Sequence, residues 1–124
     1  MVSVNRVILA GNLAKDPQLK ETSNGRAMTI FPVAVNKQWR TQDGEKHKET
    51  SYFQIVVWNA TAENCARYLK KGGAVLVEGR LQTRSYQKSD GQTRYVTQVV
   101  GDQVTFLNRP TKPSTSNDEE PSIM

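Results

Sequence analysis

Cysteine and histidine are nearly absent from the sequence, which contains one of each, Cys65 and His47. A single cysteine excludes an internal disulfide framework and a zinc cluster held by several cysteines. Cys65 falls among apolar residues at helical spacing, which favours a small core side chain over a nucleophile. His47 lies in a charged segment, where a solvated loop position is expected. Neither glycine-rich phosphate-binding spacing nor a nucleophile–base pair occurs, so we expect no enzyme, no metal and no cofactor.

Long apolar runs are also missing. Hydrophobic residues make up 36% of the 124-residue chain, and no run approaches the roughly 18 apolar residues of a membrane-spanning helix. The first residues do not combine a basic start with a long apolar stretch, so no secretory signal is expected. With a single cysteine, these features predict a cytoplasmic protein without membrane partners. A chain of this length fits one domain.

Charge is unevenly distributed along the chain. The net charge is +5, while residues 110–124 carry one lysine and three acids, a net of −2, so residues 1–109 carry +7. Residues 110–124 also hold three of the five prolines and almost nothing apolar before Ile123. This composition predicts a folded domain over residues 1–109, followed by a disordered linker and acidic tail over residues 110–124. The basic body suggests a polyanionic partner.

The body shows the pattern of short β-strands. Strands are predicted over residues 2–9, 27–36, 50–58, 74–87, 95–100 and 104–107, the first of them ending at Gly11-Asn12. Turns are expected at Ser23-Asn24-Gly25, at residues 41–45 and at Ser89-Asp90-Gly91. Residues 2–9 carry apolar side chains at both parities, so this strand is expected to be covered on both faces, and a second subunit is one such cover.

One helix is predicted between residues 59 and 71. Its apolar residues recur at helical spacing: Ala62, Cys65, Ala66 and Leu69. Thr61 is the expected N-cap, and Gly72-Gly73 ends the helix. Three strands, a helix and the strand segments that follow it predict a mainly β fold, a five-stranded Greek-key barrel of the OB type with one α-helix between strands three and four. A plain five-stranded α+β sheet is the structural alternative.

Aromatic rings fall beside basic residues on strand faces that point away from the predicted core. Tyr52 and Trp58 lie on the parity opposite to the apolar residues of their strand, and Tyr86 shares its parity with Arg84. An exposed ring needs a reason, because burying it would contribute roughly 1.5–3 kcal/mol. Unpaired bases supply that reason, since stacking on an aromatic ring contributes roughly 1–3 kcal/mol per base while nearby cations bind phosphates.

The alternative interpretation is that these rings belong to the core, as rings in small β domains usually do. Trp39 falls by alternation on the side of Phe31 and Val33, and it needs a bulge or a barrel bend to face outward. Four further rings are predicted to be core or interface residues: Phe53, Tyr68, Tyr95 and Phe106.

Four segments of the body carry a resemblance, in order and with matching spacing. They are residues 5–13 (NRVILAGNL) with Asp16-Pro17, residues 50–58 (TSYFQIVVW), residues 66–72 (ARYLKKG) and residues 77–86 (VEGRLQTRSY). In these segments the sequence resembles bacterial-type single-stranded DNA-binding proteins. The resemblance implies an OB-fold, a homotetramer whose subunits meet across the first strand, and sequence-independent binding of single-stranded DNA in replication, recombination and repair.

The resemblance also implies the residues of the binding site. Base stacking is implied for Trp39, Tyr52, Trp58 and Tyr86, which places Trp39 on the ligand face against its parity. Phosphate or groove contacts are implied for Arg6, Lys20, Arg40, Gln54, Val56, Lys71 and Arg84. Gln54 and Ala60 stand where relatives carry Arg and Lys, so the groove is expected to lack two charges.

The end of the chain, DEEPSIM, keeps acids followed by apolar residues but has no terminal Phe, which is usual in the family. By resemblance, recruitment of replication and repair proteins is expected through Asp118, Glu119, Glu120, Pro121, Ile123 and Met124. Two other classes remain open: an OB-fold adaptor of the primosome type that binds proteins, and an RNA-binding OB protein.

Overall fold

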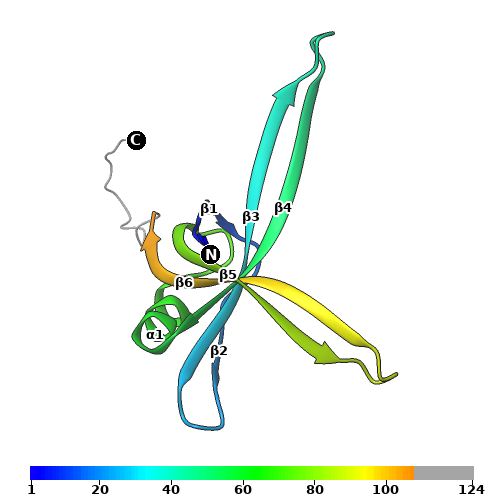
Figure 1. Cartoon of the computed structure of the whole chain (residues 1–124). Helices are drawn as coiled ribbons and strands as arrows, with labels where there is room; N and C mark the ends of the chain where they lie inside the picture. The colour runs from blue at the N-terminus through cyan, green and yellow to red at the C-terminus, as the bar shows by residue number, and fades with distance from the viewer. Residues whose placement is uncertain (108–124) are drawn as a thin grey trace, which may run out of the picture.

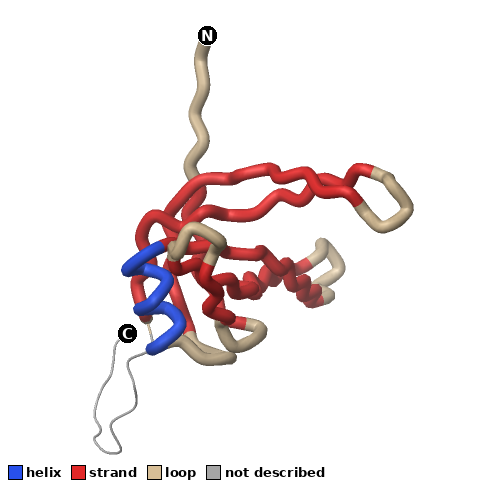
Figure 2. The backbone as a smooth tube through the Cα atoms, turned by 90° about the horizontal axis from the view of Figure 1, so that it is seen from below, coloured by secondary structure: helices blue, strands red, loops and turns tan. Residues whose placement is uncertain are grey.

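The computed structural model describes residues 1–107, which form six strands and one helix (Figure 1, Figure 2). In chain order these are β1 (Val7–Leu13), β2 (Gln18–Glu21), β3 (Ala27–Arg40), β4 (Lys46–Trp58), α1 (Asn59–Tyr68), β5 (Ala74–Gln87) and β6 (Thr93–Phe106). The predicted boundary at residue 109, the linker and the acidic tail lie outside the described residues.

Five of the strands close into a barrel. The sheet has the order β1-β5-β6-β4-β3-β2, and β1 also pairs with β3 through Asn12↔Ala34 and Leu13↔Val33. The β4–β6 pairing is parallel, whereas the other pairings are antiparallel. Because the β1–β3 pairing removes the open edges of the five strands, the flat α+β alternative is excluded. The OB-fold prediction is confirmed, with α1 between the third and fourth barrel strands, β4 and β5.

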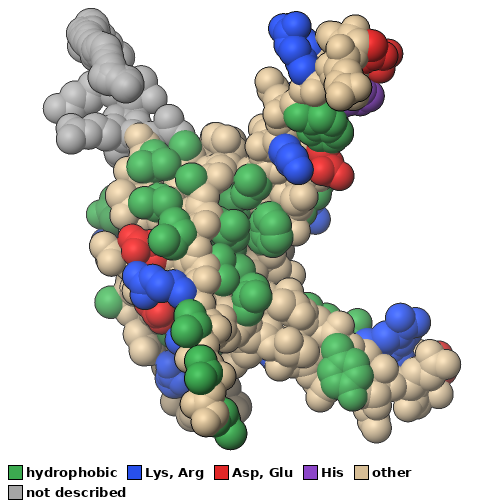
Figure 3. All heavy atoms as spheres, turned by 45° about the horizontal axis from the view of Figure 1, so that its top comes forward, with side chains coloured by type: hydrophobic (Ala, Val, Ile, Leu, Met, Phe, Trp, Pro, Cys, Tyr) green, Lys and Arg blue, Asp and Glu red, His purple; other side chains and the backbone are tan. Residues whose placement is uncertain are grey.

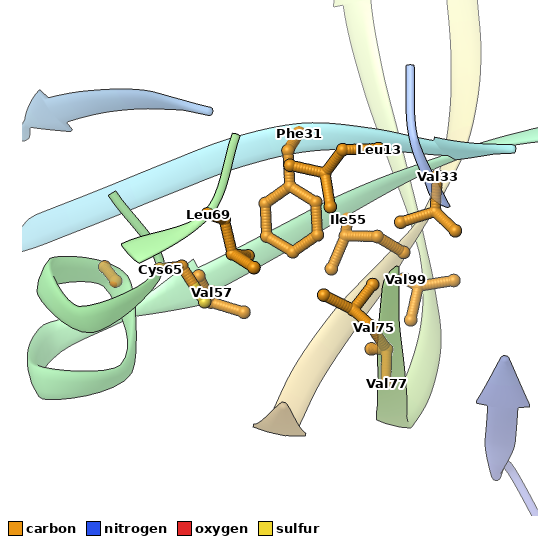
Figure 4. Close-up of a cluster of buried hydrophobic side chains, with 11 residues drawn as sticks. Leu13, Phe31, Val33, Ile55, Val57, Cys65, Leu69, Val75, Val77 and Val99 are labelled. Atoms are coloured by element: carbon orange, nitrogen blue, oxygen red, sulfur yellow. The ribbon is translucent and has the colours of Figure 1, made fainter. Parts of the chain in front are cut away.

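The barrel interior is filled by one side of each strand and closed at one end by α1. The buried side chains are Leu13, Phe31, Val33, Ile55, Val57, Ala62, Cys65, Leu69, Val75, Val77 and Val99 (Figure 4). The buried Thr29 hydroxyl donates to the Ala62 carbonyl at 2.7 Å, which links β3 to the helix. Burial raises the pKa of the Cys65 thiol to about 12, so its nucleophilic thiolate form is suppressed. Cys65 is therefore a core residue, as predicted.

Two pairs of strands continue past the barrel as hairpin arms. The β3–β4 arm and the β5–β6 arm project from the barrel in different directions (Figure 1, Figure 2). Beyond Val35 every residue of β3 is exposed, and β5 is exposed from Arg80 to its end. The predicted turns at residues 23–25, 41–45 and 89–91 are confirmed as the loops between paired strands. Both faces of a two-stranded arm meet solvent because no second layer covers them.

The first two strands differ from the prediction. β1 begins at Val7 and runs through Gly11 and Asn12, which were predicted to end it. Gly11 belongs to the strand because β1 crosses β3 there, and a Cβ on Gly11 would lie 2.2 Å from the Ala34 carbonyl oxygen. β2 was not predicted, since its four residues are all exposed and lack an apolar alternation. It pairs with β3 as an edge hairpin.

The helix start and the last strand also differ. Thr61 is not the N-cap: Trp58 occupies that position without a side-chain hydrogen bond, and Asn59 takes a φ of 58° as β4 turns directly into α1. Asn tolerates this left-handed conformation better than most residues. Residues 95–100 and 104–107 were predicted as separate strands, but β6 continues between them. Its register with β5 shifts at Glu78/Gly79, so an irregularity replaces the expected break.

Candidate nucleic-acid interface

The strand registers place one set of side chains on the side of the sheet opposite the core, which we call the non-core face. Residues directly opposite one another on neighbouring strands point to the same side. This face comprises Lys20 on β2; Met28, Ile30, Pro32 and Ala34 on β3; Tyr52, Gln54, Val56 and Trp58 on β4; Arg94, Val96, Gln98 and Val100 on β6; and Arg80, Gln82, Arg84 and Tyr86 on β5.

Three of the four predicted stacking rings lie on the non-core face. The exposed fractions are 67% for Tyr52 and 49% for Tyr86, and Trp58 is half-buried at the end of β4. Tyr52 borders an open groove of about 380 Å³ that also includes Gln54, Pro32 and Asp16. The Tyr52 and Tyr86 rings are therefore accessible to a planar ligand, as base stacking requires.

Trp39 lies on the other side of the β3–β4 arm. The register runs without interruption from Met28↔Trp58 to Arg40↔Lys46, so alternation holds along the whole arm. With no bulge in the register, Trp39 stays on the side of its parity, so its implied placement on the same face as the other rings is not found. Trp39 is 41% exposed on that side, where every residue of β3 beyond Val35 is exposed.

His47 is not the loop residue that the sequence suggested. It lies on β4 directly opposite Trp39, and the two rings are stacked with centroids 5.4 Å apart and planes 16° apart. The Lys37 ammonium lies 5.5 Å from the centroid of the Trp39 ring, and the Glu45 carboxylate lies 3.4 Å from His47 Nε2. A hollow of about 670 Å³ beside this cluster is lined by Gln38, Trp39, Arg40, Lys46, His47 and Lys48.

The predicted phosphate-contacting cations occupy different places. Lys20 and Arg84 lie on the non-core face, Lys20 opposite Met28 and Arg84 two residues from Tyr86. Arg40 ends β3 beside Lys46. Figure 3 shows Lys and Arg side chains at the ends of both arms. These cations flank the rings, so an anion held by them would lie next to a stacked base.

Two predicted cations are tied to other parts of the barrel. The Arg6 guanidinium lies 3.5 Å from the Glu78 carboxylate. Arg6 directly precedes β1, and Glu78 lies opposite Ile8 in the part of β5 that pairs with β1, so this ion pair is on the barrel and not on an arm. Lys71 follows α1, and its backbone N–H donates to the Asp16 carboxylate at 2.7 Å. Asp16 lines the groove beside Tyr52, which brings the Lys71 backbone close to that groove.

Gln54 and Val56 lie between the rings with different exposure. Gln54 is exposed and lies opposite Pro32. Val56 is only 1% exposed, because Ile30 and Val100 flank it on the two neighbouring strands. The implied groove contact of the Val56 side chain is therefore corrected: as folded, this side chain offers no surface to a ligand.

Three of the rings predicted to be core or interface lie at the surface. The exposed fractions are 37% for Phe53, 54% for Tyr68 and 73% for Tyr95, while Phe106 is partly buried. Phe53 shares the parity of the core residues, but it precedes them on β4 where the arm joins the barrel. Alternation predicts the side to which a ring points, but not the residue at which the core ends.

Sequence reasoning missed the cation that contacts the Trp58 ring. The Arg26 guanidinium carbon lies 4.4 Å from the centroid of the Trp58 ring. A register counted backwards along β3 from the turn at residues 41–45 would have placed Arg26 near the end of β4. Neither alternation nor charge on its own points to this contact, because it joins segments separated by an entire hairpin.

Residues 1–107 also bear on metal binding and on membrane crossing. Within this range, no group of three or more His, Cys, Asp or Glu side chains could hold a metal ion. No helix in the same range is long and apolar enough to cross a membrane. The tail residues from Asp118 to Met124 lie outside the described part of the chain.

A closed Greek-key barrel with exposed rings and cations on its strands is typical of OB-fold proteins, whose strand surface binds oligonucleotides or oligosaccharides. The model of the single-strand binding protein family matches residues 4–107. The chain therefore belongs to the single-strand binding protein family.

Individual relatives agree with this assignment. The chain is 47% identical over 104 residues to the single-stranded DNA-binding protein of Oceanobacillus iheyensis, an alignment that covers 84% of this chain and 63% of that protein. It is 46% identical over 104 residues to single-stranded DNA-binding protein A of Bacillus subtilis, covering 84% of this chain and 59% of the relative. The chain thus spans about three fifths of the length of these relatives.

A solved structure shows the same fold. The Plasmodium falciparum SSB complex with ssDNA superposes with a TM-score of 0.80 at 27% sequence identity. The superposition covers 87% of this chain and 98% of that one.

Proposed function

We propose that this protein binds single-stranded DNA without sequence preference and without catalysis. The observation that carries the proposal is the exposure of Tyr52 and Tyr86, with Trp58 half-buried, on one face beside Lys20 and Arg84. Stacking is indifferent to base identity because every base has a π-face, and cations bind the phosphates that every nucleotide carries. Arg40 would extend the non-core face along the β3–β4 arm, and Trp39 would stack a base on the opposite side of the same arm.

The proposal places this activity in DNA replication, recombination and repair in the cytoplasm, at the nucleoid. The support is family membership and the similarity to relatives that are single-stranded DNA-binding proteins. It also includes recruitment of replication or repair proteins by the acidic residues 118–120 and the apolar residues that follow them. That part rests on sequence alone.

Titration with a dT oligomer of about 16 nucleotides tests the proposal, since one OB fold engages roughly 4–16 nucleotides. We expect the oligomer to quench the fluorescence of the two tryptophans and a mixed-sequence oligomer to bind about equally well. The logarithm of the binding constant should fall with the logarithm of salt by about 0.7 per phosphate neutralised. If about five phosphates are neutralised, affinity drops roughly a hundredfold between 50 and 200 mM salt.

The competing classes give different results in the same titration. An adaptor that binds proteins leaves the fluorescence unchanged and shows no salt-dependent DNA affinity. An RNA-binding protein is displaced from dT by poly-U at much lower concentration than by poly-dT. If the protein binds DNA but its affinity does not change with salt, the phosphate contacts of the cations are contradicted.

The proposal includes a homotetramer whose subunits meet across β1. The support is that the apolar Ile8 is 61% exposed although its strand is paired there with β5. We expect light scattering to give a mass near four chains, and the Ile8→Asp variant to give a smaller species because it would bury a charge in the interface. Leu19→Asp on β2 is the control and should keep the mass of the unmodified protein. An unchanged mass for Ile8→Asp as well would place the subunit contact elsewhere.

A further inference from the structure

We infer that Arg26 is a further DNA-contacting residue, which stacks its guanidinium on Trp58 and binds the phosphate beside a base stacked on the opposite face of that ring. The inference rests on the proposed function, because it assumes that Trp58 stacks a base. It adds a residue that lies outside the four resembling segments and that charge patterning did not single out.

The turn between β2 and β3 fixes the backbone of Arg26. The Thr22 N–H donates to the Arg26 carbonyl at 2.9 Å, and the Arg26 N–H donates to the Thr22 hydroxyl at 3.2 Å. Arg26 precedes Met28 by two residues, and Met28 lies opposite Trp58. Alternation therefore directs the Arg26 side chain to the side of the sheet that carries Trp58.

The contact between Arg26 and Trp58 has the geometry of a cation–π pair. The 4.4 Å between the guanidinium carbon and the ring centroid is well inside the roughly 6 Å reach of such interactions. A planar guanidinium that stacks on a ring keeps its N–H donors at its edge. Among residues 1–107 no carboxylate lies within ion-pair distance of Arg26, so these donors are open to an anion.

A ring covered on one face has only the other face for a base. The expected complex is thus a three-layer stack of guanidinium, indole and base. In such a stack the arginine fork lies near the backbone of the stacked nucleotide, where it can bind a phosphate through two hydrogen bonds. Lys20, opposite Met28 on β2, adds a second cation on the same side. The Arg26→Lys variant would keep the charge but lose the stacking of a planar guanidinium on the Trp58 ring.

The test uses the full-length chain with Trp39→Phe as background, so that Trp58 is the one remaining tryptophan. In this background we expect Arg26→Ala to weaken dT binding by about tenfold and to reduce the salt slope by about 0.7. Arg26→Lys should restore the salt slope but not the full affinity. The Trp58 emission of the free protein should shift in both variants, because both remove the guanidinium from the ring.

Arg67→Ala is the matched control. Arg67 is also exposed and its guanidinium lies 5.9 Å from the ring of Tyr68, but it belongs to α1 and not to the non-core face. Its removal costs the same charge and should leave affinity near that of the background. Thermal melting of each variant confirms that the fold is retained.

Three outcomes would overturn the inference. Equal affinities for Arg26→Ala and Arg67→Ala would show that Arg26 acts only through net charge. Full affinity in Arg26→Lys would remove the stacking role. Loss of binding in Trp58→Ala without any loss in Arg26→Ala would leave the proposed function standing and refute the role of Arg26. If the unmodified protein does not bind dT, the proposed function itself fails.

Discussion

Replacing Tyr52, Trp58 and Tyr86 together by alanine is expected to weaken binding of a dT oligomer by about a hundredfold or more. Each stacked base contributes roughly 1–3 kcal/mol, so even the low end of three such contacts removes most of the affinity. Trp58→Ala alone should cost roughly 1–3 kcal/mol whatever the base sequence. Fluorescence anisotropy of a labelled oligomer measures the unmodified protein and both variants at one salt concentration.

Two other exposed rings supply the control for this prediction. Tyr68 and Tyr95 are 54% and 73% exposed but lie outside the non-core face. The double variant Tyr68→Ala/Tyr95→Ala should bind dT nearly as well as the unmodified protein. A comparable loss in both sets of variants would mean that exposed rings matter only for stability or assembly. Unchanged dT affinity in the triple variant would show that its three rings do not stack bases.

The second large effect is expected in the barrel at Gly79. A Cβ at this position would lie 1.9 Å from the Val100 carbonyl oxygen and 3.0 Å from the Gly101 Cα, both of which are backbone atoms of β6. Gly79 also marks the register shift between β5 and β6. We therefore expect Gly79→Ala to lower the free energy of unfolding by about 3 kcal/mol, because the two strands must separate to admit the methyl group.

Urea unfolding at a fixed protein concentration measures this effect. Gly44→Asn is the control, since Gly44 has a φ of +85° and open space around its Cβ position. Asn tolerates that conformation, so this variant should lose no more than about 1 kcal/mol. Equal unfolding midpoints for Gly79→Ala and the unmodified protein would contradict the close approach of β5 and β6.

Much of the fold follows from local patterns. The buried residues of β3 and β5 repeat at every second position, and this alternation is determined by the geometry of a single strand. Turn-forming groups at residues 23–25, 41–45 and 89–91 place the hairpins, since their backbone preferences depend on a few neighbouring residues. Together with one helical segment, these signals were sufficient to predict the OB-fold.

The face of the sheet on which each ring lies could also be predicted from the alternation of side chains along its strand. Tyr52, Trp58 and Tyr86 lie on the face opposite the core, because parity is preserved wherever the register is unbroken. Exposure could not be predicted in the same way. Phe53 has core parity but is 37% exposed, and Val56 has the opposite parity but is 1% exposed. Exposure depends on what covers a position, and the cover comes from other strands.

The sequence by itself determined the strand periodicity, the turns and the side of the sheet on which each ring lies. Only the tertiary structure decided that β1 pairs with β3 to close the barrel, and that the arms extend beyond the core. It also decided that Arg26 meets Trp58 and that His47 meets Trp39. The physical reason is that alternation and turn preference act over a few bonds, whereas closure, exposure and ring–cation contacts depend on which distant strands become neighbours.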